Sequence, residues 1–197
     1  MKKLLILVLI VFAGYMVHKK FFGKETIRDP RDGKSYEIVT IGTQTWMAEN
    51  LNYEVADSYC FADKPESCKK YGRFYTWETA KKICPSGWHL PTRWEWEKLF
   101  NVAGGELAAG KKLKSSSGWR NRKNGTDEFG FSALPAGARI ISENGYLAEG
   151  FYAVFCSSTE TDYKNYYNAT FLHESDGVAQ AEGESKDLGC SVRCIKD

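Results

Sequence analysis

Six cysteines are the residues of this sequence best suited to chemistry, because thiols can form disulfides, bind metal ions or carry redox reactions. Spacing alone leaves fifteen pairings open. Cys60 and Cys68 enclose a short loop and form the simplest local pair. A bridge between Cys84 and Cys194 would fasten the C-terminal segment to the rest of the domain.

Cys156 and Cys190 remain, and each lies in a strand-like run where a disulfide could link neighbouring strands. Zinc is the competing interpretation, because Cys190 and Cys194 have ligand-like spacing. The sequence has no second pair at matching spacing, no histidine near Cys190 and no Cys-x-x-Cys motif of a redox-active pair. We therefore expect three structural disulfides and no metal site.

The three histidines limit the acid–base chemistry available to the chain. His18 lies in the predicted export segment over 1–23, so a Ser/His/Asp relay would require His89 or His173. His89 lies between Trp88 and Leu90, and we expect its imidazole to be packed and hydrogen-bonded. We expect the imidazole of His173 to be solvated. With no Gly-rich phosphate loop either, we expect no catalytic residues.

Aromatic and amide side chains are the best candidates for ligand contact. Tyrosines alternate with asparagines over 163–168, and Trp119 lies in a loop-like stretch over 110–130. Aromatic rings stack on sugar faces, while amides exchange hydrogen bonds with hydroxyl groups. The favoured interpretation is that the tyrosines are half core and half rim of a sheet; the hypothesis kept beside it is a ligand face of Trp119, Tyr163, Tyr166 and Asn168.

An oxygen-rich loop is the one candidate cofactor site. Asn121, Asn124, Asp127 and Glu128 offer ligand types that calcium prefers. Ordinary solvation of the loop is favoured, so we expect no cofactor, with calcium as the alternative.

These candidates need elements to position them, and the stretch over 84–99 specifies the clearest one. A Pro/Gly turn leads through a short extended segment into a capping box formed by Thr92 and Glu95. The helix that follows buries a stripe at helical spacing, made of Trp96, Leu99, Phe100 and Ala103. A shorter helix is predicted over Trp77–Ile83, capped by Thr76.

Short extended segments surround these two helices. Residues 36–42 and 45–51 predict a hairpin. Further extended runs follow at 129–138, 150–157, 166–172, 177–181 and 189–195. The pattern predicts a single α+β domain over 32–197, with two helices packed on short antiparallel strands.

The N-terminus resembles an export segment. Lys2 and Lys3 precede an apolar run over Leu4–Val17, which predicts a signal-anchor or a cleaved signal peptide over 1–23, in contact with a membrane through residues 4–22. Residues 24–31 follow as a polar tether. Residues 1–24 hold five lysines and no acids, so the remainder has 22 of the 27 basic residues against all 25 acids, a net charge of −3. That balance argues against nucleic acid as a partner.

Several motifs, taken in order, resemble one family. They are Trp46-Met47-Ala48-Glu49-Asn50-Leu51, Gly87-Trp88-His89-Leu90-Pro91-Thr92, Phe129-Gly130-Phe131-Ser132-Ala133-Leu134-Pro135 and Ser191-Val192-Arg193-Cys194. The chain resembles the Fibrobacter succinogenes major paralogous domain from about Asp29 to Asp197. The resemblance implies an exported bacterial domain with a C-type-lectin-like fold and a Cys84–Cys194 bridge. The family usually has bulky residues at 156 and 190, so the two cysteines there imply one extra disulfide.

We therefore expect an extracytoplasmic, non-catalytic module of the cell envelope, membrane-anchored or secreted, that binds a glycan or an envelope protein. The lectin signatures Glu-Pro-Asn and Trp-Asn-Asp are absent from the sequence, so the resemblance implies a scaffold without that sugar site. The first alternative is a structural envelope protein that assembles through its surface. The second is an oxidase-like enzyme of the formylglycine-generating group, which would need Cys156 and Cys190 as a reactive pair.

Overall fold

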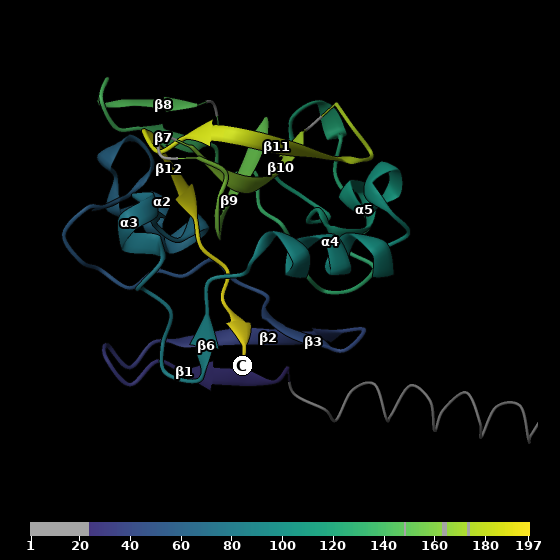
Figure 1. Cartoon of the computed structure of the whole chain (residues 1–197). Coiled ribbons are helices and arrows are strands. Elements are labelled where there is room, and N and C mark those ends of the chain that lie inside the picture. The colour runs from purple at the N-terminus through teal and green to yellow at the C-terminus, as the bar shows by residue number, and fades with distance from the viewer. Residues whose placement is uncertain (1–23, 148, 163–164, 173) are drawn as a thin grey trace, which may run out of the picture.

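A computed structural model describes residues 24–147, 149–162, 165–172 and 174–197. These residues form a β-rich fold of two curled sheets with four α-helices (Figure 1). The predicted α+β, C-type-lectin-like domain with two helices is therefore wrong. The predicted export helix over 1–23 lies outside the described residues, and none of the described helices has the length and hydropathy of a membrane span.

The smaller sheet brings both ends of the described chain together. Its strand order is β1-β2-β3-β13-β6, and all neighbouring pairs are antiparallel. Ile195 lies opposite Trp46 on one side and His89 on the other. The strands are β1 (Thr26–Arg28), β2 (Ser35–Ile41), β3 (Gln44–Met47), β6 (Trp88–His89) and β13 (Ile195–Lys196).

The larger sheet has the order β11-β10-β9-β12-β5-β4, and β7 extends it by pairing with β12 and β8. Strand β12 is parallel to β9, with Ser191 opposite Phe155, whereas its pairings with β5 and β7 are antiparallel. The strands are β4 (Ser58–Tyr59), β5 (Phe74–Tyr75), β7 (Ala138–Ile140), β8 (Gly145–Leu147), β9 (Tyr152–Glu160), β10 (Asn165–Leu172), β11 (Val178–Ser185) and β12 (Leu188–Ser191).

Two of the four helices were predicted. Helix α4 (Arg93–Val102) begins at the capping box, where the Thr92 side chain accepts from the Glu95 amide and the Glu95 carboxylate accepts from the Thr92 amide. Helix α3 (Trp77–Ala80) begins after Thr76 as expected but is shorter than predicted.

Helices α2 (Pro65–Tyr71) and α5 (Glu106–Leu113) were not predicted. Gly110 weakens the helical propensity of α5, yet a Cβ there would overlap the carbonyl oxygen of Gly177. Glycine thus lets α5 pack against the turn between β10 and β11, and this tertiary contact outweighs propensity. Two single 3-10 turns, η1 (Phe61–Asp63) and η2 (Arg120–Arg122), complete the elements.

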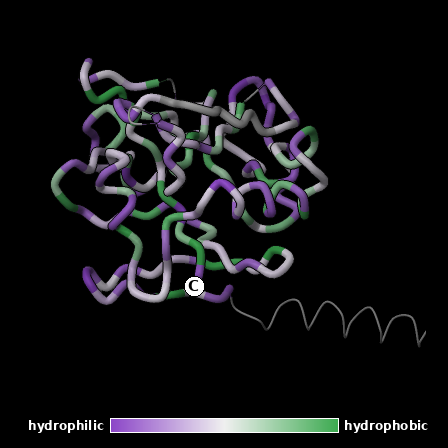
Figure 2. Tube along the Cα trace, in the orientation of Figure 1, coloured by the Kyte–Doolittle hydropathy of each residue, from purple (hydrophilic) through white to green (hydrophobic). Residues whose placement is uncertain are grey.

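Trp96 of α4 is the centre of the largest core cluster. Its ring centroid lies 4.8 Å from that of Trp46 and 5.5 Å from that of Phe155, so α4 joins the two sheets. The segment from β12 to β13 also joins them, and in Figure 2 it crosses the middle of the molecule as a largely hydrophobic stretch.

The three predicted disulfides are confirmed. They join Cys60 to Cys68, Cys84 to Cys194 and Cys156 to Cys190, with Cα atoms 4.9, 5.8 and 5.4 Å apart. Disulfides persist in oxidising environments, so the three bridges indicate an extracytoplasmic protein.

Serine in place of both Cys84 and Cys194 is expected to destabilise the domain more than serine at Cys60 and Cys68. The two bridges span 110 and 8 residues, for which chain entropy gives about 4.8 and about 2.6 kcal/mol. Urea unfolding of both double variants measures the difference. Equal losses would show that chain entropy does not set the contribution of these bridges.

Candidate functional site

Three of the four residues of the predicted ligand face are not on the surface. Trp119, Tyr166 and Asn168 are buried, and Tyr163 lies outside the described residues. The Trp119 indole donates to a backbone carbonyl at 3.2 Å, and the Tyr166 hydroxyl donates to a carbonyl of β12 at 3.0 Å. Strand β10 is covered on both faces, because Tyr166 packs in one core cluster and Tyr167, Ala169 and Phe171 pack in another. Burial therefore overturns the prediction for these three residues, which belong to the core.

His89, one of the two histidines considered for catalysis, joins two carboxylates. Its Nδ1 lies 2.7 Å from Asp197 Oδ1, and its Nε2 lies 2.8 Å from Glu95 Oε1. Burial lowers the pKa of the imidazole, but the two carboxylates outweigh burial and raise the pKa overall. The imidazole thus links Asp197, the residue after β13, to the capping box of α4, while His173 lies outside the described residues.

The oxygen-rich loop uses two of its side chains internally. Asn124 Oδ1 accepts from the Trp119 amide at 3.1 Å, and Asp127 Oδ1 accepts from the Ser132 amide at 2.6 Å. Among the residues that the structure describes, no cluster of three His, Cys, Asp or Glu side chains could hold a metal ion. The calcium alternative at Asn121, Asn124, Asp127 and Glu128 stays a prediction.

A polar cleft of about 690 Å³ lies on another part of the molecule. It opens where β2 and β3 of the smaller sheet meet α2 and the loop before β7. Its walls are formed by Lys24, by residues 34–39, by residues 48–50 and 52, by residues 68–72, and by residues 127, 130, 132 and 134. These segments lie far apart in the sequence, so the cleft exists only in the folded chain.

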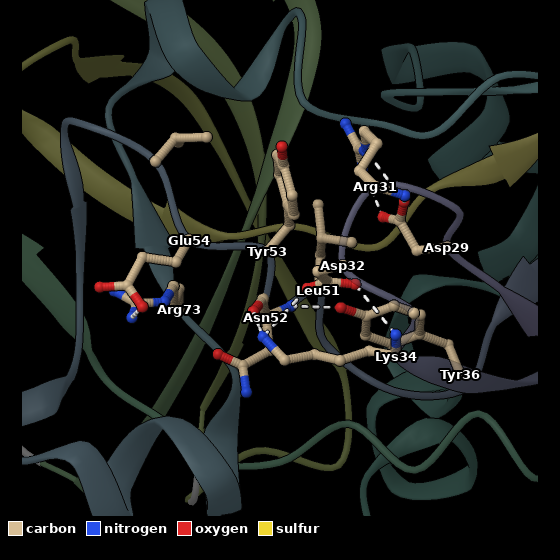
Figure 3. Close-up of polar contacts among 12 residues, drawn as sticks. Asp29, Arg31, Asp32, Lys34, Tyr36, Leu51, Asn52, Tyr53, Glu54 and Arg73 are labelled. Atoms are coloured by element: carbon tan, nitrogen blue, oxygen red, sulfur yellow. Dashed lines mark hydrogen bonds and ion pairs between the residues drawn. The ribbon is translucent and has the colours of Figure 1, made fainter.

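A second hollow of about 500 Å³ adjoins the polar cleft, since both are lined by Lys34, Asn52, Cys68 and Lys69. We call the two together the groove. Lys34 lies where the two hollows meet. Its ammonium group donates to the Asn52 carbonyl at 2.5 Å and lies 3.1 Å from the Asp32 carboxylate (Figure 3). The Asn52 amide donates to the Tyr36 hydroxyl at 3.1 Å, which fixes the backbone of this wall.

Beyond Lys34, Arg73 borders the second hollow. Figure 3 shows it beside Glu54, with Nη2 and Oε2 2.7 Å apart. The groove thus presents cations, carboxylates and amides side by side along its length.

The buried side chain of Arg193 connects the walls of the polar cleft through hydrogen bonds. The guanidinium is fully buried and donates to Asn50 Oδ1 at 2.9 Å, to the Ser132 carbonyl at 2.8 Å and to the Phe131 carbonyl. Asn50 in turn donates to the Tyr71 carbonyl at the end of α2, at 2.8 Å. One side chain therefore connects three walls: 48–52, 68–72 and 127–134.

Burial lowers the pKa of Arg193 to about 9, so it is charged at neutral pH, while the charges of Asp127 and Glu49 act in the opposite direction. These two carboxylates line the polar cleft together with Glu37. The cleft therefore has carboxylates in its lining together with Lys24, Lys34, Lys69 and Lys70.

Gly72 lets α2 approach this network. Its φ is +72°, and a Cβ would lie 2.7 Å from Asn50 Cβ and 2.8 Å from the carbonyl oxygens of Asn50 and Leu51. Any other residue would push α2 away from the cleft wall.

The family model named Fibrobacter succinogenes major domain matches residues 39–196. The chain belongs to this family. The resemblance seen in the motifs is thereby confirmed. Searches of the curated proteins and of the solved structures find no match.

The Fibrobacter succinogenes major domain contains most of the groove, including Asn50, Arg193 and the loop over 127–134, whereas Lys24 and Glu37 precede the matched residues. Sequence reasoning missed this groove. The available signal is a charged residue, Arg193, between apolar residues of a strand-like run, which suggests a buried charge but not the segments it joins.

We expect the melting temperature to fall by about 2–4 °C between about pH 6 and about pH 8.5 as His89 loses its proton. Folding raises its pKa, so the protonated imidazole stabilises the domain fully below the ordinary value of 6.5, and this stability is lost as pH rises through the folded pKa. Because the site is partly exposed and screened, the contribution is on the order of 1 kcal/mol. His89→Gln should remove this pH dependence; identical profiles for variant and wild type would contradict the assignment.

Arg193→Met is expected to lower the free energy of unfolding by about 3–5 kcal/mol, because two buried acceptors and one partly buried acceptor lose their donor. Arg139→Met is the matched control: Arg139 is also buried, but among the described residues it donates a hydrogen bond to Asn144 alone. Denaturant unfolding compares the two variants. A loss at Arg193 no larger than at Arg139 would refute the role of Arg193 as the tie between the walls.

Proposed function

We propose that this domain is a non-catalytic binding module of the cell envelope that holds a glycan in the groove. The observation that carries the proposal is a polar groove whose walls are tied together by a buried arginine. Residues 1–23 would attach the module to the membrane or direct its secretion, consistent with the oxidising environment that the three disulfides indicate.

The chemistry of the groove supports a glycan as the ligand. Sugar hydroxyls both donate and accept hydrogen bonds. The groove offers the carboxylates of Glu49 and Asp127 as acceptors, the Lys69 ammonium group as a donor, and the side-chain amide of Asn52 as both. Two adjoining hollows suit an extended oligomer better than a compact metabolite.

The fixed walls also favour binding. Asn50, Tyr71 and Ser132 are held in one hydrogen-bond network with Arg193, so the walls need little ordering when a ligand enters. Preorganisation of this kind lowers the entropic cost of association.

Screening the full-length protein on a glycan array, followed by calorimetry with the best oligosaccharide, tests the proposal. Asn52→Ala and Glu49→Gln should each weaken binding about tenfold, the loss of one well-placed hydrogen bond. Glu143→Gln is the matched control, because Glu143 is exposed and lies outside the lining of the groove.

Undiminished binding by both groove variants would place the ligand elsewhere and contradict the proposal. No glycan binding, together with oligomers that form as concentration rises, would instead favour an envelope assembly protein.

A further inference from the structure

The folded domain begins directly after the predicted export segment. Strand β1 starts at Thr26, inside the stretch expected to be a polar tether, and the Glu25 carbonyl accepts from the Ile38 amide of β2 at 2.9 Å. Residues 4–22 are predicted to contact a membrane, and a single glycine separates them from Lys24. Two residues of extended chain span at most about 7 Å. A membrane that holds residues 4–22 therefore lies within that distance of Lys24.

Lys24 also lines the polar cleft, in a part that we call the Lys24 end. A hydrogen bond to Glu37, 2.6 Å away, is the main cause that raises the pKa of Lys24, and the charges of Glu49 and Asp127 raise it further. All four residues line the cleft. Glu37 belongs to β2, Glu49 follows β3, and Asp127 lies in the loop before β7. The chain thus enters the fold at one end of the cleft.

The charges of the polar cleft favour a neutral ligand. Its charged side chains are Lys24, Lys34, Lys69, Lys70, Glu37, Glu49 and Asp127, so four positive charges face three negative ones. A phosphate headgroup is bound by a basic pocket, which this balance does not provide. Sugar hydroxyls exchange hydrogen bonds without carrying a charge. Among membrane lipids, the headgroups that fit this lining are neutral glycans.

We propose that the Lys24 end of the polar cleft lies at the membrane surface and that the groove binds the neutral glycan headgroup of a lipid in that membrane. The inference rests on the proposed function, since it takes a glycan as the ligand and residues 1–23 as the membrane attachment. It narrows the source of the glycan to the membrane itself. A ligand held in the same membrane meets the groove at an effective concentration on the order of millimolar, so a weak site is sufficient.

Headgroup quenching in vesicles tests the placement. The full-length protein is inserted into phosphatidylcholine vesicles that contain lipids with a nitroxide on the headgroup, and a bimane fluorophore is attached to Glu128→Cys or, as the matched control, to Glu143→Cys. Both residues are exposed. Glu128 follows Asp127 at the Lys24 end, whereas Glu143 lies in the turn between β7 and β8, at the end of the molecule opposite β1 (Figure 1). The label at 128 should lose most of its fluorescence and the label at 143 little.

A linker variant completes this test. Insertion of about 20 Gly/Ser residues between Gly23 and Lys24 lets the domain move about 25 Å from the membrane. The linker should relieve the quenching at residue 128 and leave residue 143 unchanged. Equal quenching of both labels in the chain without the linker, or no effect of the linker, would overturn the inference and leave the proposed function standing. A mature exported protein whose N-terminal sequence begins after the export segment would overturn it in the same way.

A photoreactive digalactosyldiacylglycerol in the same vesicles tests the source of the glycan. It should crosslink to peptides that line the groove, and Asn52→Ala should lower the yield about tenfold, the loss of one well-placed hydrogen bond. Glu143→Gln is the control and should leave the yield unchanged. Crosslinks outside the groove, or none, would overturn the lipid as the ligand. The proposed function still stands if the glycans of the array bind from solution, and it fails if neither source binds.

Discussion

The structure depends on burying one cation, the Arg193 guanidinium, among oxygen atoms of neutral groups. Removing a guanidinium from water is costly unless its hydrogen bonds are replaced. Here Asn50 and the carbonyls of Phe131 and Ser132 replace them, and the rings of Phe131 and Phe155 lie 4.4 and 5.4 Å from the charge. These groups come from distant segments, so the charge is stabilised only when all of them are in place.

The segment around Arg193 is fixed in three different ways. Its backbone pairs with the end of β3 and the chain that follows, since the Met47 amide donates to the Cys194 carbonyl and the Leu51 amide donates to the Val192 carbonyl. Cys194 adds a covalent bond to Cys84, and Arg193 adds its side-chain hydrogen bonds. Backbone hydrogen bonds, a disulfide and side-chain hydrogen bonds therefore all hold residues 192–194, which support the walls of the polar cleft.

Local signals were readable from the sequence, whereas features that need distant partners were not. The capping box of Thr92 and Glu95 predicted the start of α4, because capping is a contact within one turn. Helix α5 was missed, because its Gly110 argues against a helix until Gly177 is known to lie against it. The tyrosine-rich run stayed a candidate ligand face, since alternation does not reveal that both faces of β10 are covered. The groove is built from segments with no shared pattern.

The connection between Arg193 and Asn50 spans 143 residues. During vectorial synthesis, the segment carrying Asn50 leaves the ribosome long before the arginine that will hold it. The chain therefore stays incompletely folded while it is made, because contacts between distant residues must wait for the later partner. An unfolded nascent chain is the form that can be threaded through a translocation channel, so late closure of the fold suits a protein that matures after crossing a membrane.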